Sequence, residues 1–446
     1  MKTKIFLTLA LSACALSLFA AGEFDSALLR GSTDKDIPFY EPGQEMVFTI
    51  KMTGLTNSVP AGEWFVKWER TGDDGKSFGG KVPVPMAEPL VVKTSLDQPG
   101  FVRVKAVVVD KAGKNYTRTN PKLKWESKTV FFDGSAGVHP EKLQSEPEPK
   151  DFDAFWAKQR ERLAKVPVTA TCIELPCGNP KAKLWAVEIP CAGVRPVTGY
   201  LTIPKASEEG KKFPCALETH GYSYRAPHNP PGGAREDEIV LNINAHGMKL
   251  PAFGADDGYY KALGWEIKSN GKSYAFDPEQ NKDPEVAYFN GMVLRVMRAL
   301  QYLKTLPEWN GKDLRARGGS QGGLQTIWAA GCGEGVTQAD SGITWCCDMA
   351  NNTRRLERKM ASDGWYIPWT PALGYYDPVN VAKRIPRTCM TTITRAGLGD
   401  YCCPPRGLAI LYNNIPGPKK IWWVQGSTHG YVPPAPNQNF WIDDSK

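Results

Sequence analysis

The amino-acid sequence predicts an α/β domain with a doubly wound, mostly parallel sheet, preceded by a β-sandwich domain. Two observations predict this arrangement. Between residues 23 and 138, short stretches such as EWFVKWE and FVRVKAVVVD alternate apolar and polar residues, and turn clusters separate them. Between residues 151 and 446, apolar strand-like runs alternate with helical ones. Period-two alternation favours half-buried strands, whereas the alternation of strands with helices favours a parallel sheet covered by helices.

The chain begins with a segment of the secretory type. Residues 1–22 contain two lysines, an apolar run and then small residues, which is the pattern of a cleavable signal peptide. We expect cleavage between Ala20 and Gly22 and a secreted or periplasmic protein. The segment LSAC, which ends at Cys14, also resembles a bacterial lipoprotein signal, in which Cys14 would be lipidated. No later stretch has the roughly 18 apolar residues that a membrane span requires.

The charge of the chain does not suggest a nucleic-acid partner. The formal net charge is +8, and it becomes +6 when Lys2 and Lys4 leave with the signal peptide. The remaining charge is spread along the chain without a long basic run. Such a balance bears on solubility and is not the signature of a nucleic-acid-binding protein.

The cysteines suggest disulfide bonds in an oxidising compartment. Eleven cysteines become ten without Cys14, which is an even number, so we expect some of them to be paired. The vicinal pairs Cys346-Cys347 and Cys402-Cys403 lack the CxxC or HxxxH spacing of zinc sites. We therefore expect no metal there.

Residues 23–138 are expected to form a sandwich of the immunoglobulin type. Strand-like alternation recurs at 46–52, 63–69 and 101–110, with turn clusters between them and no helical period of useful length. Short alternating strands over about a hundred residues are typical of this fold. Residues 139–150, HPEKLQSEPEPK, are rich in proline and charge and are expected to form a linker.

Residues 151–446 are expected to form the α/β domain. DFDAFWAKQRERL predicts an amphipathic helix, and strands are expected in FPCALETHG and EIVLNINAHG, whose continuous apolar runs fit burial on both faces. A long helix is expected near 285–305, because apolar residues recur there at three- and four-residue spacing: Val286, Phe289, Val293, Val296, Leu300 and Leu303. DLRARGGS follows as a strand and turn, and a helix is expected from about residue 322.

The segment RGGSQGG, residues 317–323, predicts a nucleophilic serine. A Gly-x-Ser-x-Gly motif between a strand and a helix forms a tight turn that needs small residues two positions before and two after the serine. Gly318 and Gly322 occupy these positions around Ser320, and Gly319 and Gly323 add room. A phosphate-binding loop would require the GxxxxGK[ST] pattern, which is absent. A purely structural turn stays open as the alternative.

A serine nucleophile requires a histidine base and a carboxylate that orients it. Only one histidine follows Ser320 in the chain, His429, and it comes after the apolar strand KIWWV. Two aspartates are candidates for the acid. Asp400 follows a strand about thirty residues before His429, and a proline pair that starts a helix follows it; Asp348 follows the preceding strand. The position one strand before the histidine favours Asp400.

The oxyanion hole is expected to use two backbone N–H groups. One belongs to Gln321, the residue after the nucleophile, and the other to the loop THGYSY after the third strand, where Tyr222 is the natural choice. An ordinary tight turn is the alternative interpretation of HGY.

These motifs together resemble a known family of esterases. Ser320 in GGSQGG, Asp400 in GLGDYCCPP, His429 after a strand, HGY at 220–222 and DFDAFW at 151–156 resemble the acetyl xylan esterases and cephalosporin C deacetylases, carbohydrate esterase family seven, over about residues 145–432. The resemblance implies an α/β-hydrolase that removes small acyl groups, chiefly acetyl, from sugar hydroxyls without a metal or organic cofactor. It implies an acetylated carbohydrate as the partner.

The sequence departs from the family in three places. The family's Arg-Gly-Gln is here INAHGMKL, with His246-Gly247 at that place, and its closing His-Glu is His429-Gly430. His246 is therefore either a pocket residue or an ordinary loop histidine. The preceding sandwich is an addition to the family's pattern, so the ring-shaped oligomer of the family is not carried over and the oligomeric state stays open.

The segment 364–378, GWYIPWTPALGYYDP, is an aromatic insertion between two strands. Its rings either form a stacking wall for sugars near the cleft mouth or pack the insertion onto the domain; they are Trp365, Tyr366, Trp369, Tyr375 and Tyr376.

The sequence thus predicts a secreted serine esterase that acts on acetylated sugars such as xylan, through Ser320, His429 and Asp400. Two alternatives remain. A serine exopeptidase of the prolyl-oligopeptidase type would carry a similar Gly-Gly-Ser-x-Gly-Gly turn, and a glycan-binding protein would use the sandwich while the hydrolase domain stays inert. An ordered set of Ser, Asp and His argues against an inert domain.

Overall fold

The computed structural model describes residues 24–55, 59, 62–120, 122–123, 126–224, 234–351 and 366–445. The expected signal peptide at 1–22, including Cys14, and Trp365 of the aromatic insertion lie outside these residues. Within the described part of the chain, no helix combines the length and the apolar character that crossing a membrane requires.

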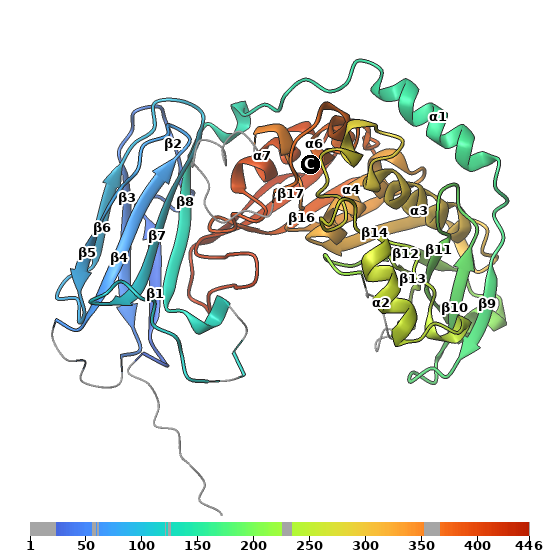
Figure 1. Ribbon diagram of the computed structural model, residues 1–446, viewed down its shortest axis with the longest axis horizontal. Coiled ribbons are helices and arrows are strands. Elements are labelled where there is room, and N and C mark those ends of the chain that lie inside the picture. The colour runs from blue at the N-terminus through green and yellow to red at the C-terminus, as the bar shows by residue number, and fades with distance from the viewer. Residues whose placement is uncertain are drawn as a thin grey trace, which may run out of the picture.

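The N-terminal part of the chain consists of two sheets that face each other (Figure 1). The smaller sheet has the order β1-β3-β6 and is antiparallel, with bounds Leu28–Thr33, Met46–Thr53 and Leu90–Thr94. The larger sheet has the order β2-β8-β7-β4-β5, with bounds Phe39–Tyr40, Phe131–Val138, Gly100–Asp110, Trp64–Gly72 and Phe78–Pro83. Its neighbours are antiparallel except β2 and β8, which are parallel. The expected strands are therefore present, and their immunoglobulin type stays a prediction.

Strand β7 is buried on both faces, which the alternation in its sequence does not predict. Val102, Val104, Ala106 and Val108 face the sandwich core as expected. On the other face, Arg103 is only 6% exposed and Lys105 is half-buried. This second face is covered because the larger sheet leans against the C-terminal part of the chain.

The second part of the chain is built on a ten-stranded sheet with the order β18-β17-β16-β15-β14-β12-β13-β11-β10-β9 (Figure 1). The strands from β12 to β17 are parallel to one another, whereas β9, β10, β11 and β18 are antiparallel to the strands beside them. The bounds in chain order are Thr171–Leu175, Ala182–Ile189, Val197–Pro204, Phe213–Thr219, Ile239–Ile243, Trp309–Gly319, Gln338–Gly342, Met390–Gly397, Lys419–Val424 and Asn439–Asp444. The predicted α/β class with a large, mostly parallel sheet is confirmed.

Six α-helices are described with this sheet. They are α1 Phe152–Ala164, α2 Asp257–Glu266, α3 Tyr288–Leu303, α4 Gln321–Cys332, α6 Pro378–Val381 and α7 Pro405–Asn414. Helix α1 buries the four residues predicted for its apolar face, namely Phe152, Phe155, Trp156 and Leu163. Helix α3 is shorter than expected: Val286 precedes it and is 57% exposed, so its place in the predicted apolar face is wrong. The other five predicted residues of α3 are buried.

The two parts of the chain are in intimate contact beside strand β16. A Cβ atom on Gly399 would lie only 1.9 Å from the carbonyl oxygen of Asp133 in β8, so the two backbones touch directly. The Gln425 amide donates to the Ser135 carbonyl and accepts from the Ser135 N–H, both at 3.0 Å. Because these contacts are buried and involve backbone atoms, they fix the larger sandwich sheet against the loop that follows β16.

The segment 139–150 is held to the body of the protein at both ends. The Asn413 amide donates to the carbonyls of Pro140 and Leu143. Glu148 accepts from Arg384 at 2.7 Å and from Lys383 at 3.1 Å. The segment therefore packs along the domain that follows it, and the domain boundaries themselves stay a prediction.

Candidate active site

Ser320 occupies the turn between strand β14 and helix α4. Its backbone has φ 59° and ψ −120°, a conformation that a residue with a side chain rarely adopts. Such strain persists only where the surroundings enforce it, and it is concentrated at functional sites. The turn has the geometry of the nucleophile elbow that the motif predicts, and it places Ser320 at the carboxyl end of strand β14.

The glycines around Ser320 differ in what they permit. A Cβ atom at Gly318 would lie 2.4 Å from Thr219 Oγ1, one at Gly322 would lie 2.5 Å from the Thr219 carbonyl oxygen, and one at Gly323 would lie 2.7 Å from the Gly342 carbonyl oxygen. Gly319 has no contact closer than 3.7 Å. Three of the four glycines are thus required by close backbone packing, whereas the room expected at Gly319 is not needed.

The structure brings Ser320, His429 and Asp400 together. Ser320 Oγ lies 3.1 Å from His429 Nε2, and His429 Nδ1 lies 3.0 Å from Asp400 Oδ2. His429 comes from the loop after β17 and Asp400 from the loop after β16. In the tautomer that satisfies both contacts, Nδ1–H donates to Asp400 and Nε2 accepts from the serine hydroxyl.

Asp400 is fully buried and held by its own loop. Its Oδ1 accepts from the backbone N–H groups of Cys402 and Cys403, both at 2.9 Å, which leaves Oδ2 for His429. The alternative acid, Asp348, is also buried, but it accepts from Asn351 at 2.8 Å and lies 3.4 Å from Arg406 Nε. Of the two candidates, the structure places Asp400 beside His429.

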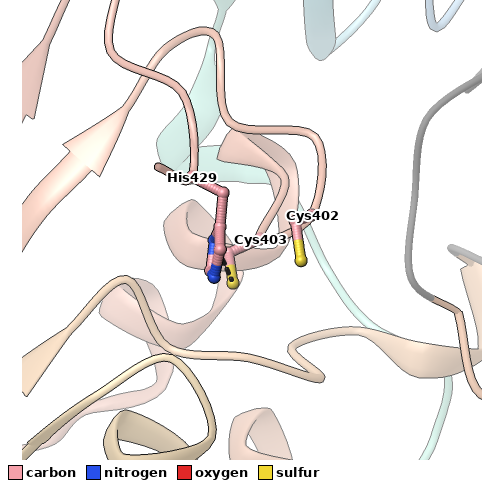
Figure 2. Close-up of side chains that lie close together, drawn as sticks. All are labelled: Cys402, Cys403 and His429. Atoms are coloured by element: carbon pink, nitrogen blue, oxygen red, sulfur yellow. Dashed lines mark hydrogen bonds between the residues drawn. The ribbon is translucent and has the colours of Figure 1, made fainter. Parts of the chain in front are cut away.

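Two thiols lie beside the imidazole of His429. Figure 2 shows Cys402 and Cys403 next to the ring, with Cys403 Sγ 3.7 Å from Nδ1. Burial by itself lowers the pKa of His429, but its hydrogen bonds and charge interactions with Asp400 and Cys402 together raise this pKa above the ordinary value. In turn, the hydrogen bond from Cys403 and the proximity of His429 lower the pKa of the Cys402 thiol.

The same three side chains have a spacing compatible with a metal ion, since their ligand atoms lie within 4.8 Å of one another. Cys402 and Cys403 are adjacent in the sequence, but His429 comes from another loop. The cluster could therefore be recognised only from the structure. The His429 Nδ1 carries the proton that Asp400 accepts, so a metal there would have to displace it. We assign no metal to these residues.

The residues predicted for the oxyanion hole lie on either side of the elbow. Gln321 is the first residue of α4, where backbone N–H groups have no partner within the helix. Gly221, which precedes Tyr222, lies on the loop after β12, and a Cβ atom added to it would have the Gly319 carbonyl oxygen as its nearest neighbour, at 3.8 Å. The loop that carries Tyr222 therefore passes directly over the elbow.

Tyr274 is a residue of this site that the sequence does not reveal. Its hydroxyl donates to the Gln321 side chain at 2.8 Å, and its ring stacks on Tyr222 with centroids 4.2 Å apart. It thus contacts both residues of the predicted oxyanion hole from a segment about fifty residues away from either. No local motif marks it, so only the fold could have identified it.

The two histidines near this loop have structural roles. His220 donates from Nδ1 to the Gly221 carbonyl and accepts at Nε2 from the Ala245 N–H, and burial lowers its pKa to about 4. His246 is fully buried and is hydrogen-bonded to Tyr288 and to the Ser223 carbonyl. Of the two interpretations of His246, the structure favours the ordinary loop histidine, because its side chain does not reach an open surface.

The aromatic insertion packs mainly onto the protein. The ring centres of Tyr375 and Phe155 lie 4.4 Å apart, and the ring of Tyr376 makes an edge contact with the ring of Trp156, so both tyrosines pack against helix α1. Trp369 is partly buried against the main core. Tyr366 is the exception, because its hydroxyl donates to the carbonyl of Tyr401 beside the candidate site.

The expectation of disulfide bonds is wrong for this structure. All ten cysteines in the described part of the chain are free thiols. Six of them are buried, where a thiol behaves as a small apolar side chain. Their even number and the predicted compartment are therefore not sufficient evidence for pairing.

Known esterases resemble the chain in sequence. A sequence model described as acetyl xylan esterase (AXE1) matches residues 141–359. The chain is 28% identical over 305 residues to the acetyl esterase Axe7A of Xylanibacter ruminicola, and the match covers 64% of each protein, which is less than two thirds of that relative's length.

Solved structures show the same fold over about two thirds of the chain. An acetyl xylan esterase from a Paenibacillus species has a TM-score of 0.52 and 21% identity, covering 66% of this chain and 94% of that one. Acetyl xylan esterase 1 from a Thermoanaerobacterium species has a TM-score of 0.52 and 20% identity, covering 67% of this chain and 93% of that one. The resemblance that the motifs predict is confirmed: the chain is similar in sequence to acetyl esterases and acetyl xylan esterases.

Proposed function

We propose that the protein is a secreted serine esterase that removes acetyl or other small acyl groups from sugars such as acetylated xylan or xylo-oligosaccharides. The relatives are named as acetyl and acetyl xylan esterases, which supports the ester bond and the acyl group. The single observation that carries the mechanism is the hydrogen-bonded series of Ser320, His429 and Asp400, in which Ser320 itself lies in a strained turn.

The proposed reaction has two steps. His429 Nε2 takes the proton of Ser320 as its oxygen attacks the ester carbonyl, and the N–H groups of Gln321 and Tyr222 bind the oxyanion. Asp400 keeps the proton on Nδ1 and stabilises the imidazolium. The imidazolium then protonates the departing sugar oxygen, and a water molecule, activated by the same base, releases the acid from Ser320.

Two further parts of the proposal concern the N-terminal region. We propose that residues 1–22 direct secretion, on the evidence of their sequence pattern, and that the two facing sheets are of the immunoglobulin type. Mass spectrometry of the mature protein would give the first residue and would show whether Cys14 carries a lipid.

The test of the activity is a panel of three substrates: p-nitrophenyl acetate, acetylated xylo-oligosaccharides and aminoacyl anilides. We expect hydrolysis of the two esters and none of the anilides. Preferential cleavage of the anilides would instead support a serine exopeptidase. Binding of glycans without any hydrolysis would support an inert binding protein. Acetate release that survives Ser320→Ala would contradict the mechanism.

A further inference from the structure

A cavity of about 540 Å³ opens beside His429 and has one wall from each part of the chain. The C-terminal wall includes Asp400, Tyr401, Cys402 and His429. The opposite wall belongs to the N-terminal sandwich and comes from strands β7 and β8 and the segment between them; its members include Arg103, Asn115, Thr117, Lys128, Phe131 and Asp133. The volume of the cavity lies within the range of about 300–1,000 Å³ that is typical of small-molecule sites.

The proposed reaction requires the departing sugar to lie next to His429, which is one of the residues that line this cavity. The departing oxygen takes its proton from His429 Nε2, so the leaving group must lie next to the imidazole when the acyl-enzyme forms. The acyl group, by contrast, lies toward the N–H groups that bind the oxyanion. The cavity is lined by His429 and does not need to hold the small acyl group, so it is where the rest of the substrate would extend.

The sandwich wall carries groups that suit a sugar chain. Asn115, Thr117 and Lys128 offer amide, hydroxyl and ammonium groups that can bond to sugar hydroxyls. The ring of Phe131 adds an apolar surface. A few polar groups placed around an apolar surface are the usual composition of a specific ligand site.

The wall is held rigidly against the catalytic loop. Arg103 forms an ion pair with Asp133 at 2.5 Å, and its guanidinium lies 3.9 Å from the ring centre of Tyr401, the residue after Asp400. Ser135 Oγ and the Tyr401 hydroxyl are 2.8 Å apart. With the direct contact between Gly399 and Asp133, these interactions attach the wall to the loop that carries Asp400, and a binding site needs such support from packed neighbours.

We propose that the N-terminal sandwich forms the binding wall for the glycan part of the substrate and so gives the esterase its preference for oligosaccharides over small esters. This inference rests on the proposed function. It assigns the sandwich a place inside the active site, rather than a separate binding role at a distance from it.

The experiment compares kcat/KM for acetylated xylotriose with kcat/KM for p-nitrophenyl acetate, using the full chain. We expect Lys128→Ala to lower the ratio of the two values by roughly five- to tenfold, as expected for the loss of a single hydrogen bond. Thr117→Trp, which fills the cavity from an exposed position, should lower the ratio by more than tenfold. The matched control is Lys93→Ala, on the smaller sheet of the same sandwich, where Lys93 is 61% exposed and paired with Glu45; its ratio should equal that of the wild type.

The outcomes separate the inference from the function on which it rests. If the wild type deacetylates xylotriose and neither wall variant changes the ratio, the glycan does not lie against the sandwich. If the wild type hydrolyses only p-nitrophenyl acetate, a glycan is not the occupant of the cavity. If the wild type hydrolyses neither ester in a manner that depends on Ser320, the proposed function itself is wrong.

Discussion

The two sides of His429 are built in different ways. On one side, Ser320 sits in a turn whose glycines leave no room for a methyl group, so its geometry is determined by local backbone packing. On the other side, half-buried and exposed side chains of a separate sandwich face the ring across an open cavity. The groups proposed to react are therefore specified by short motifs and by order along the chain, whereas the surface proposed to receive the sugar is formed by the docking of two distant segments.

The strongest effect should arise on the motif side. Ser320→Ala should reduce kcat on p-nitrophenyl acetate by about 10⁴-fold or more, because the nucleophile and its base act as a unit. Ser207→Ala, at a partly exposed position outside the site, should leave kcat unchanged. A loss of only a few-fold for Ser320→Ala, in a protein whose thermal unfolding is unchanged, would mean that another group attacks the ester.

The next effect in size should distinguish the two aspartates. Asp400→Asn should reduce kcat by about 10³- to 10⁴-fold, because the base would lose its orienting partner and its correct tautomer. Asp348→Asn should lower the melting temperature, since Asp348 is buried beside Arg406, while kcat stays within a few-fold of the wild type. Equal losses of kcat for the two variants would contradict the assignment of the acid.

The third prediction concerns the packing that holds the serine. Gly322→Ala should lower the free energy of unfolding by about 1–3 kcal/mol, because the new methyl group would overlap the Thr219 carbonyl. The sign of this change in the free energy of unfolding is informative, since Gly→Ala within a helix normally stabilises the helix by about 1 kcal/mol. Gly319→Ala is the matched control and should change the free energy of unfolding by less than about 0.5 kcal/mol, as measured by urea denaturation.

The weakest effect should be a shift in the pH profile. In the proposed mechanism His429 acts as a base only when it is neutral, and its pKa lies above the ordinary value. The limb along which kcat/KM rises with pH should therefore have its midpoint above about pH 6.5, the ordinary pKa of histidine. Cys402→Ser removes one of the groups that raise this pKa and should move the limb to lower pH. Cys172→Ser, which changes an exposed thiol distant in sequence from His429, should leave the pH profile where it is. A limb that stays in place in Cys402→Ser would show that the thiol does not influence the imidazole.

Much of the fold and the reacting groups could be predicted from the sequence. The spacing of apolar residues predicts the larger elements, because buried positions recur every second residue in a strand and every three or four residues in a helix. Ser320 was identifiable because glycines two residues before and two after a serine, between a strand and a helix, are typical of a turn in which backbones pack closely, and His429 because no other histidine follows Ser320 in the chain. These signals are local or depend on order along the chain, so they need no coordinates.

The rest depends on contacts between distant segments. Tyr274 carries no motif, yet it contacts Gln321 and Tyr222. The outer face of β7 includes the charged Arg103 and Lys105, and Arg103 is buried where Tyr401 and Asp133 cover it. Val286 fits the apolar spacing of α3, but the helix begins two residues later. For Tyr274 and Arg103, contacts between distant segments decide the outcome, and a pattern within one segment does not contain them.

The decisive experiment on the proposed role of Ser320 is the reaction of the protein with a serine-directed phosphonate ester, followed by peptide mass spectrometry and a crystal structure of the adduct. We expect a single covalent bond to Ser320 Oγ, with a phosphoryl oxygen bonded to the N–H groups of Gln321 and Tyr222 and His429 still beside Asp400. An adduct on another residue, or full inactivation without any modification of Ser320, would contradict the proposed mechanism.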